Sequence, residues 1–464
     1  MRKRIFPVFL CILLIFGVLP LAGCGAKPML DPENPVTVSL WHNYGGQMKE
    51  TMDALVNEFN NTVGSEQGVI VSVTSVSSSS SIVKMLEMAA NGEPGAPVLP
   101  DVTTLYPVTA LFLKEKGLIA DLNNYFSDAE LSAYIPAFLK EGYIDDALYV
   151  FPVAKSTEVL FLNRTLFDRF SAATGVTVES LSTFEGIAKA SQSYYIWTDS
   201  LTPDVEYDGK AFYMPDSWFN LAQIGMEQLN TSLIEDEQLN LTSDSYTRVF
   251  ETFYRPSVEG SIAIADSYSS EFMKTGDIVC STGSTAGVLF YGDSITYPDN
   301  TVEQVVFDVL PYPVFEGGEK VALQRGGGMS VFKSDATREY ASSVFIKWFT
   351  QAKQNERFVS STGYMPVTQE AFLSVVNAGA KSENTNVSKL LMTASGMLEE
   401  YRFYLPPVFN GFDEMDDDYT AGWKSSVLNA REEYKALLAE LSADAAYEAV
   451  SESALIEFAK SRRQ

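Results

Sequence analysis

The sequence predicts an α/β protein with a mostly parallel sheet, helices on the sheet faces and a helical C-terminal part. Runs of alternating apolar residues, typical of strands, recur along the chain: 36–41, 69–76 and 158–163. Segments with helical apolar spacing follow them, at 48–59, 82–90 and 166–170. With 464 residues, 46% of them apolar, the chain can bury the cores of two lobes or more.

The N-terminus has the pattern of a secretory signal. Three basic residues, Arg2 to Arg4, precede an apolar run over 5–19. This run is shorter than the roughly 20 residues that a membrane-spanning helix needs, which favours a cleaved signal over a permanent anchor helix. It ends in Leu21-Ala22-Gly23-Cys24, which resembles the bacterial lipobox.

These features predict a lipoprotein signal peptide over 1–23 and lipidation at Cys24. Residues 24–35 contain three prolines and are expected to form a lipidated tether. The folded part would then lie outside the cytoplasm, lipid-anchored to the bacterial cell membrane, with acyl chains as its contact with the bilayer.

The cysteines agree with this prediction. Of the three in the sequence, Cys11 would be lost with the signal and Cys24 would carry lipid, so Cys280 would have no partner for an intramolecular disulfide. A buried cysteine at a strand end is favoured over a reactive thiol, because Cys280 follows Ile278 and Val279.

The charge excludes one class of partner. The formal net charge is −27, and loss of the basic signal residues makes it more negative. Such an acidic body would repel nucleic acid, so no nucleic-acid partner is expected.

The first elements follow in order from the periodicity. Val36 to Trp41 alternate as in a strand, and the next segment is helical by its apolar stripe: Met48, Met52, Leu55, Val56 and Phe59. A second strand over 69–76 is followed by the serine run 77–81 and by an amphipathic segment with Ile82, Val83, Leu86 and Ala90.

The same patterns return later in the chain. Strands are predicted over 158–163 and 304–310, and a helix over 339–351. From about residue 368 the chain is predicted to be largely helical, and one C-terminal stripe consists of Tyr434, Leu437, Leu438 and Leu441. We find no internal repeat.

Several segments, in this order, resemble bacterial extracellular solute-binding proteins of the carbohydrate-binding group, most closely the glycerol-phosphate-binding branch. They span 36 to about 370: Leu40-Trp41-His42, Ala54 to Asn60, Pro152 to Asn163, Gly276-Asp277, Ser281 to Ser284, Gly326-Gly327-Gly328, Phe345 to Phe349 and Thr362 to Thr368. No single segment identifies the family, but the occurrence of all of them in this order does.

The resemblance implies two α/β lobes with a periplasmic-binding-protein-like fold, a hinge and an interlobe cleft. Lobe 1 would comprise 36–153 plus 325–366, and lobe 2 would comprise 154–324 plus 367–464. It further implies a substrate-binding lipoprotein of an ABC importer that delivers a sugar, oligosaccharide or polyol to the permease transmembrane subunits. The protein would be a monomer and need no cofactor. Closure of the hinge would bury the ligand on both sides.

The resemblance also implies ligand-binding positions: Tyr106, Ser156, Ser284, Gly327 and Tyr364. A sugar needs aromatic planes for its C–H faces and short polar groups or backbone amides for its hydroxyls. Ser156 and Ser284 would exchange hydrogen bonds with hydroxyls, while Gly327 would let the backbone approach the ligand. Each has a simpler alternative: a capping serine, a tight glycine turn, or packing of Tyr364 on Pro366.

Four further positions are candidates for ligand contact. His42, Asn43 and Tyr44 close the first strand at the expected cleft rim, although Asn43 could equally be a cap. Trp218 lies where the family often places a stacking aromatic residue, with core packing as the alternative.

One departure from the resemblance bears on the ligand. The glycerol-phosphate branch has an arginine for the phosphate in the segment that here reads Phe409-Asn410-Gly411-Phe412-Asp413, and Tyr106 stands in place of its glutamate. Because a buried phosphate needs a fork-shaped cation, and only Arg325 and Arg402 are nearby substitutes, a neutral sugar or polyol is predicted over a phosphoester.

Two other classes of protein were weighed. A secreted glycoside hydrolase would use paired carboxylates, but the acidic residues cluster as solvated faces do, and His42 is the only histidine available for a triad. A surface adhesin would better suit repeats. No catalytic residue and no metal site are predicted, since the run Asp413 to Asp418 lacks calcium-loop spacing and is expected to be an exposed turn.

Overall fold

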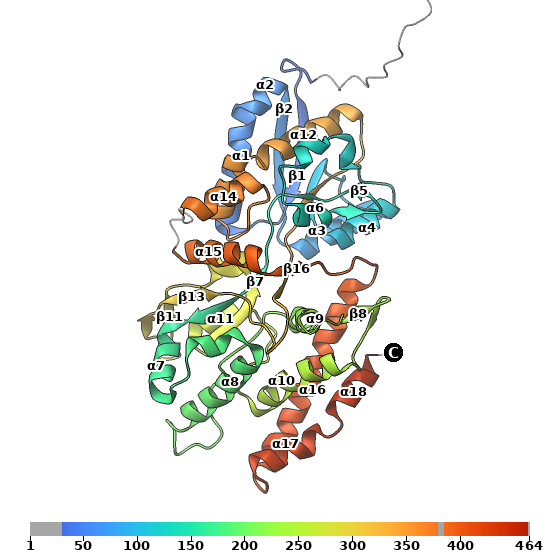
Figure 1. Ribbon diagram of the computed structural model, residues 1–464. Coiled ribbons are helices and arrows are strands. Elements are labelled where there is room, and N and C mark those ends of the chain that lie inside the picture. The colour runs from blue at the N-terminus through green and yellow to red at the C-terminus, as the bar shows by residue number, and fades with distance from the viewer. Residues whose placement is uncertain (1–29, 379–384, 463–464) are drawn as a thin grey trace, which may run out of the picture.

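The computed structural model describes residues 30–378 and 385–462 and arranges them as two lobes, one above the other in Figure 1. The predicted signal peptide and the lipidation site Cys24 lie outside the described residues. None of the helices in the described part is both long and apolar enough to span a bilayer.

The upper lobe is built on a five-stranded sheet in which residues far apart in sequence lie side by side. Its order is β2 (Val69–Ser75), β1 (Val36–His42), β3 (Val102–Leu105), β15 (Gly328–Val331) and β6 (Phe151–Pro152). Strand β1 is parallel to both of its neighbours, while β15 is antiparallel to β3 and β6. The parallel sheet expected from the sequence is therefore present in this lobe.

The helices of the upper lobe begin and end close to where the periodicity placed them. Helix α1 (Gly46–Asn61) buries the predicted stripe, and α12 (Ala336–Phe349) covers β1. Helix α3 (Ser79–Ala90) starts inside the serine run, because the hydroxyl of Ser78 accepts the backbone N–H of Ser81 at 3.1 Å as an N-cap. Helix α4 (Pro107–Glu115) follows β3 directly.

The lower lobe contains a three-stranded sheet of order β10 (Cys280–Ser284), β7 (Glu158–Asn163) and β13 (Phe307–Leu310). Both pairings are antiparallel, so the mostly parallel sheet predicted from sequence is wrong for this lobe. Every residue of β7 is buried, as expected for a central strand covered on both faces. Cys280 is buried at the start of β10, which confirms the structural role predicted for it.

The strand predicted over 304–310 is divided in two. Residues Val302–Gln304 form β12 and pair with β11 (Ser294–Thr296), whereas Phe307–Leu310 form β13 and pair with β7. The alternation of side chains continues through the bend at Val305 and Val306, so periodicity could not reveal the change of pairing partner.

Three segments meet between the lobes and are hydrogen-bonded to one another. Ser156 and Arg325 exchange backbone hydrogen bonds of 2.7 and 2.8 Å, and Lys155 and Met365 exchange bonds of 3.2 and 2.6 Å. We call these three segments, 153–157, 324–327 and 364–367, the hinge. Two of them, 153–157 and 324–327, run from one lobe into the other, while 364–367 returns to the upper lobe, where α14 (Gln369–Ala378) packs on α13 (Ala352–Ser360).

The C-terminal part is largely helical, as predicted (Figure 1). Its helices are α14 (Gln369–Ala378), α15 (Thr385–Glu400), α16 (Phe412–Leu437), α17 (Ala443–Ser451) and α18 (Ala454–Ser461). Helix α16 ends at Leu437, so the predicted stripe is cut there, and Leu441 is exposed. The acidic run 413–418, expected as an exposed turn, instead forms the first turns of α16, where carboxylates interact favourably with the helix dipole.

Smaller elements complete the two lobes. The remaining helices are α2 (Val63–Gln67), α5 (Asp128–Leu131), α6 (Pro136–Lys140), α7 (Arg164–Thr174), α8 (Phe184–Asp199), α9 (Trp218–Gln228), α10 (Asp244–Glu259), α11 (Ser269–Thr275) and α13 (Ala352–Ser360), with 3-10 turns η1 (Leu122–Asn124), η2 (Val178–Ser182) and η3 (Thr285–Phe290). Short strand pairs are β4 (Tyr143–Ile144) with β5 (Ala147–Leu148), β8 (Ile234–Glu235) with β9 (Gln238–Leu239), and β14 (Val321–Leu323) with β16 (Arg402–Tyr404).

Candidate functional site

A cavity of about 670 Å³ lies beside the hinge, between the upper lobe and the start of α16. Its walls come from α3, from the first turn of α4, from the hinge, and from the segment that leads into α16. The side chains in these walls are Ser79, Ser80, Val83, Lys84, Glu87, Tyr106, Pro107, Val108, Thr109, Glu141, Gln324, Arg325, Pro406, Pro407, Val408, Phe412 and Asp413. The volume falls within the range typical of small-molecule sites.

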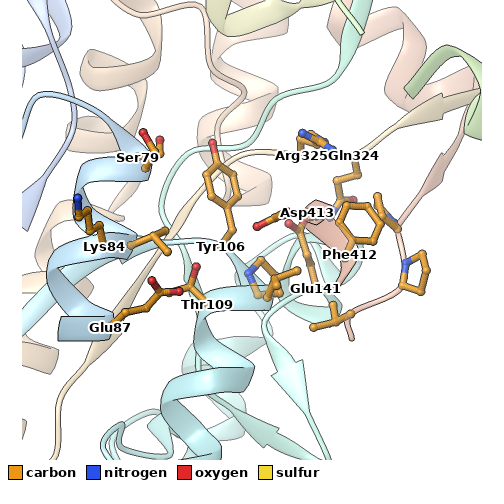
Figure 2. A pocket seen from close by; sticks show the side chains of 17 residues that line it. Ser79, Lys84, Glu87, Tyr106, Thr109, Glu141, Gln324, Arg325, Phe412 and Asp413 are labelled. Carbon is orange, nitrogen blue, oxygen red and sulfur yellow. Dashed lines mark hydrogen bonds between the residues drawn. The ribbon is translucent and has the colours of Figure 1, made fainter. Parts of the chain in front are cut away.

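Figure 2 shows Tyr106 in the middle of these walls. Lys84 and Glu87 of α3 lie on one side of its ring, and Arg325 and Asp413 lie on the other. Tyr106 is the N-cap residue of α4, directly after β3, and its side chain is 41% exposed. The site therefore forms at the carboxyl ends of the parallel strands, where open α/β sheets bind ligands.

A smaller hollow adjoins the cavity and shares Ser79, Val83 and Tyr106 with it. It is also lined by four of the residues predicted from sequence: Asn43, Tyr44, Gly327 and Tyr364. Five of the nine predicted positions thus come together around one space, although they lie up to about 320 residues apart in sequence.

The aromatic rings in the smaller hollow are held by their neighbours. The ring of Tyr44 meets the ring of Tyr364 edge-on, with centroids 6.4 Å apart. Phe358 stacks against Tyr364 and meets Tyr44 edge-on. Burial raises the pKa of both phenols well above its ordinary value, so both are neutral hydrogen-bonding groups.

Asn43 links two strands at the rim of this hollow. Its side-chain amide donates to the hydroxyl of Ser79 at 2.7 Å and accepts from the hydroxyl of Thr104 at 3.3 Å. These bonds connect the end of β1 to α3 and β3, so Asn43 orders the walls of the site whether or not it contacts a ligand.

The other four predicted positions do not line either space. Ser156 is buried in the hinge, and the Ser284 hydroxyl accepts the backbone N–H of Ala286 at 3.3 Å, as in a cap. The His42 ring is fully buried; its Nδ1 accepts the backbone N–H of Tyr44, and burial lowers its pKa to about 4, so it is neutral. Trp218 is buried and stacks on Trp423 with centroids 4.8 Å apart.

Sequence reasoning missed most of the charged lining. Lys84, Glu87 and Glu141 were not considered, and Asp413 was assigned to a solvated acidic run. One signal could have found α3: the serine run follows the carboxyl end of a predicted parallel strand. The approach of Glu141 to α16 depends on tertiary structure and had no local signal.

Arg325 is the cation of the hinge that faces the cavity. Within residues 30–378 and 385–462 its guanidinium has no ion pair and no hydrogen bond. Burial raises the pKa of the carboxyls of Glu158, Asp413 and Asp416, and Arg325 opposes this rise through its charge. Its N–H donors are thus free to bind a guest.

These carboxyls lie in poorly solvated positions. Burial raises the pKa of Glu158 to about 7, against the opposing effect of a 2.7 Å hydrogen bond from the amide of Asn220. Burial also raises the pKa of Asp413 and of Asp416. The site therefore combines carboxyl groups, one free guanidinium and aromatic rings, a set suited to a guest with both hydroxyls and C–H faces.

A second cation in the hinge is fully engaged. The Lys155 ammonium lies 2.9 Å from Glu141 Oε2 and donates to the carbonyl of Gly326 at 3.0 Å. Gln324 also donates to Glu141, at 2.6 Å. This buried network joins α6 of the upper lobe to two hinge segments, so it fixes the geometry at the pivot.

Within the described residues, no cluster of three or more histidine, cysteine, aspartate or glutamate side chains has the geometry for a metal ion.

Known proteins resemble this chain in sequence and in fold. Residues 54–385 match the model of a family described as bacterial extracellular solute-binding protein. No match was found among curated protein sequences.

Solved structures with the same fold cover nearly the whole chain. A cyclic alpha-maltosyl-1,6-maltose binding protein from Arthrobacter globiformis has 17% identity and a TM-score of 0.66, covering 92% of this chain and 100% of that one. UgpB from Mycobacterium tuberculosis, in complex with glycerophosphocholine, has 16% identity and a TM-score of 0.67, with 93% and 100% covered.

A further similar structure is an ABC substrate-binding protein from Listeria monocytogenes in complex with cycloalternan. It has 14% identity and a TM-score of 0.63, with 92% and 99% of the two chains covered. At these identities the similarity establishes the two-lobe fold. The matched family and these neighbours are binding proteins, not enzymes.

Proposed function

Because this chain belongs to the bacterial extracellular solute-binding proteins, which act outside the cytoplasm, we propose that it is the substrate-binding lipoprotein of an ABC importer. It captures a sugar, oligosaccharide or polyol in the cavity beside the hinge and delivers it to the permease subunits in the membrane. The cavity beside a three-segment hinge is the observation that carries this proposal. Closure about the hinge would enclose the guest and give the permease a shape to recognise.

The lining of the site supports an uncharged, hydroxyl-rich guest. Tyr106, Tyr364 and Phe412 offer apolar surfaces for C–H faces, while Ser79, Gln324 and Arg325 offer donors and acceptors for hydroxyls. The ligand-binding residues that we propose are therefore Tyr106, Asn43, Tyr44, Gly327 and Tyr364, with Arg325 and Asp413 added. Ser156 and Ser284 remain candidates that would have to turn toward the guest on closure.

The size of the cavity supports an oligosaccharide over a small polyol. A hexose has about 12 non-hydrogen atoms, and it would fill about half of the volume even if each atom were given the roughly 30 Å³ of a liquid water molecule. The cavity in this conformation therefore has room for a disaccharide or longer chain.

A phosphodiester such as a glycerophosphodiester is the second candidate, because Arg325 is free to pair with an anion. The carboxyls of Asp413 and Asp416 near it oppose this, since each would repel a phosphate when ionised. We therefore place the neutral guest first.

A melting-shift screen tests the proposal. Purified protein is heated with maltose, maltotriose, cellobiose, cellotriose, sorbitol or glycerophosphocholine, and each guest is analysed by chromatography afterwards. A sugar should raise the melting temperature and be recovered unchanged. Stabilisation by glycerophosphocholine alone would favour the second candidate, and consumption of a sugar would contradict the binding role.

Anchoring through Cys24 is part of the same proposal and rests on the sequence motif. Mass spectrometry of protein extracted from membranes should find a diacylated Cys24 at the mature N-terminus. Recovery of the full-length protein from the soluble fraction would contradict it.

A further inference from the structure

The most exposed aromatic side chain in the described part of the chain is Tyr268, which is 75% exposed. It is the N-cap residue of α11 in the lower lobe. Leaving so much apolar area in water is unfavourable. Exposed aromatic residues of this kind are common where a protein receives a ligand or a partner.

A carboxylate fixes Tyr268 at the end of the lower sheet. The backbone N–H of Ser269, the next residue, donates to Asp216 Oδ1 at 2.9 Å, and the backbone N–H of Asp216 donates to the carbonyl of Thr282 in β10 at 2.9 Å. A Cβ atom on Gly283 would lie 2.4 Å from Asp216 Oδ2, so a larger residue there would displace the Asp216 carboxylate. These contacts hold the start of α11 against β10.

This end of β10 is the end that leads to the hinge. Thr285, directly after β10, donates its backbone N–H to the carbonyl of Thr157 in the hinge at 2.8 Å. On the other side of Tyr268, Asp266 forms a 2.8 Å ion pair with Lys424 of α16. Tyr213 pairs in parallel with both Ile262 and Cys280, so the segment that leads to Tyr268 ends at the same edge of the lower sheet as β10, beside the hinge. Tyr268 therefore lies in a loop that is held by both β10 and α16 at the hinge end of the lower lobe.

Tyr106 is the exposed aromatic residue on the upper-lobe side of the cavity. Burial raises the pKa of the Tyr106 hydroxyl, and the phenol of Tyr268 adds to this rise. Both rings are also partly exposed, at 41% and 75%. One ring from each lobe is thus available on either side of the cleft.

We propose that Tyr268 is a ligand-contacting residue of the lower lobe, whose ring covers the C–H face of a sugar ring held against Tyr106. The inference rests on the proposed function and names the chemistry that the lower lobe recognises: the flat apolar face of a cyclic sugar. Contact with Tyr268 would form as the hinge closes, because its ring is solvated in this conformation. The residue would then favour cyclic sugars over acyclic polyols.

Four substitutions separate ring stacking from other roles. Calorimetric titrations with maltotriose and with cellotriose compare wild type with Tyr268→Phe, Tyr268→Trp, Tyr268→Leu and Tyr268→Ala. We expect Phe and Trp to stay within about threefold of wild type, because they keep a flat ring. Leu and Ala should weaken binding by roughly tenfold or more, the size of a lost stacking contact.

A matched control is Tyr207→Ala, which removes a tyrosine that is 47% exposed from the loop after α8. It should leave both titrations unchanged. Melting temperatures without sugar should agree within a degree or two among the Tyr268 variants, since an exposed ring makes few packing contacts.

The outcomes distinguish the inference from the function on which it rests. If wild type binds a probe but Tyr268→Ala binds it equally well, the inference fails and the proposed function stands. If Tyr268→Phe is as weak as Tyr268→Ala, the hydroxyl rather than the ring face makes the contact, and stacking is refuted. If wild type binds neither trisaccharide nor any sugar in the screen, both fail together.

Discussion

At the residue scale, Glu158 links the chemistry of the site to the stability of the lower lobe. Its carboxyl is 7% exposed at the start of β7, beside the amide of Asn220, and Arg325 acts on it only at a distance. A carboxylate in such a position costs free energy when it ionises. The free energy of unfolding of the protein should therefore depend on pH over the range in which Glu158 titrates.

The direction in which stability changes with pH follows from the two pKa values. The carboxyl has a reference pKa of 4.5 and a folded pKa of about 7, so the folded protein holds the proton more tightly than the unfolded chain. The stabilising contribution is complete below about pH 4.5 and is lost as the pH rises to 7, with a total of roughly 3 kcal/mol at most.

Glu158→Gln should therefore be more stable than wild type at pH 8, because it removes the cost of the buried charge. Urea unfolding at pH 5, 6, 7 and 8 measures this, and the fall in stability between pH 5 and 7 should be shallower in the variant. The exposed Glu93→Gln is the control and should keep the wild-type slope. Parallel curves for Glu158→Gln and wild type would contradict the assignment.

The ion pair of Lys155 and Glu141 gives a second prediction at this scale. Both side chains are buried, with 2% and 10% of their area exposed. Lys155→Met should lower the free energy of unfolding by about 3–5 kcal/mol, because Glu141 is left charged without a cation. Lys155→Met with Glu141→Gln should recover a large part of that loss in urea unfolding.

An exposed pair provides the comparison. Lys320 and Glu400 also form an ion pair, but their side chains are 53% and 61% exposed. Lys320→Met should change stability by less than about 1 kcal/mol. Equal losses for Lys155→Met and Lys320→Met would show that burial does not set the strength of the hinge network.

At the element scale, the two glycines at the end of the 324–327 hinge segment have different roles. Gly326 has φ +112°, and a Cβ there would lie 2.7 Å from the carbonyl oxygen of Ala154. Gly327 has no such strain; a Cβ there would lie 3.6 Å from the nearest atom, the carbonyl oxygen of Leu105. The first is needed for the hinge backbone and the second borders the smaller hollow.

Substitution of each glycine by alanine should distinguish these two roles. Gly326→Ala should destabilise the protein by about 2–4 kcal/mol or prevent its folding, since neither the φ angle nor the neighbouring backbone admits a side chain. Gly327→Ala should fold with a melting temperature near wild type but bind maltotriose more weakly, because the methyl group enters the hollow. Differential scanning calorimetry and titration measure the two effects, and normal stability of Gly326→Ala would contradict this view of the hinge.

Elements with strong local periodicity were predictable from the sequence. The apolar patterns correctly placed strands β1 and β7 and helices α1 and α12. Each of these elements buries apolar residues within its own lobe, so its pattern is visible in the local sequence. The divided strand at Val305 and Val306 and the helix formed by the acidic run depend on pairing partners and on the helix dipole. Neither feature changes the spacing of apolar residues, so the sequence pattern could not predict it.

Only those parts of the site that match the family's sequence pattern could be predicted. Tyr106, Gly327 and Tyr364 gather around one space as expected. Arg325 matters because its guanidinium has no partner among the residues that the structure describes, and Asp413 because the start of α16 borders the cavity. Both depend on contacts between segments roughly 90 to 270 residues apart, which periodicity does not report.

At the scale of the whole molecule, the hinge determines what ligand binding can do. In the described part of the chain, 153–157 and 324–327 cross between the lobes, and the bonds among Lys155, Ser156, Arg325 and Met365 tie them to each other and to 364–367. Such a joint permits rotation of one rigid lobe against the other while it resists separation. The large cavity beside it, with Tyr106 on one lobe and Tyr268 on the other, is then the space that rotation would reduce.

Small-angle X-ray scattering should therefore detect closure. Saturating maltotriose or cellotriose, whichever raises the melting temperature in the screen, should lower the radius of gyration toward the roughly 22 Å of a compact chain of this length. The far-ultraviolet circular dichroism should stay constant, because rotation about the hinge leaves both sheets intact. Tyr268→Ala should need more sugar for the same change, since closure and binding share one free energy. A scattering curve that does not change when a bound sugar saturates the protein would refute closure and leave only a rigid pocket.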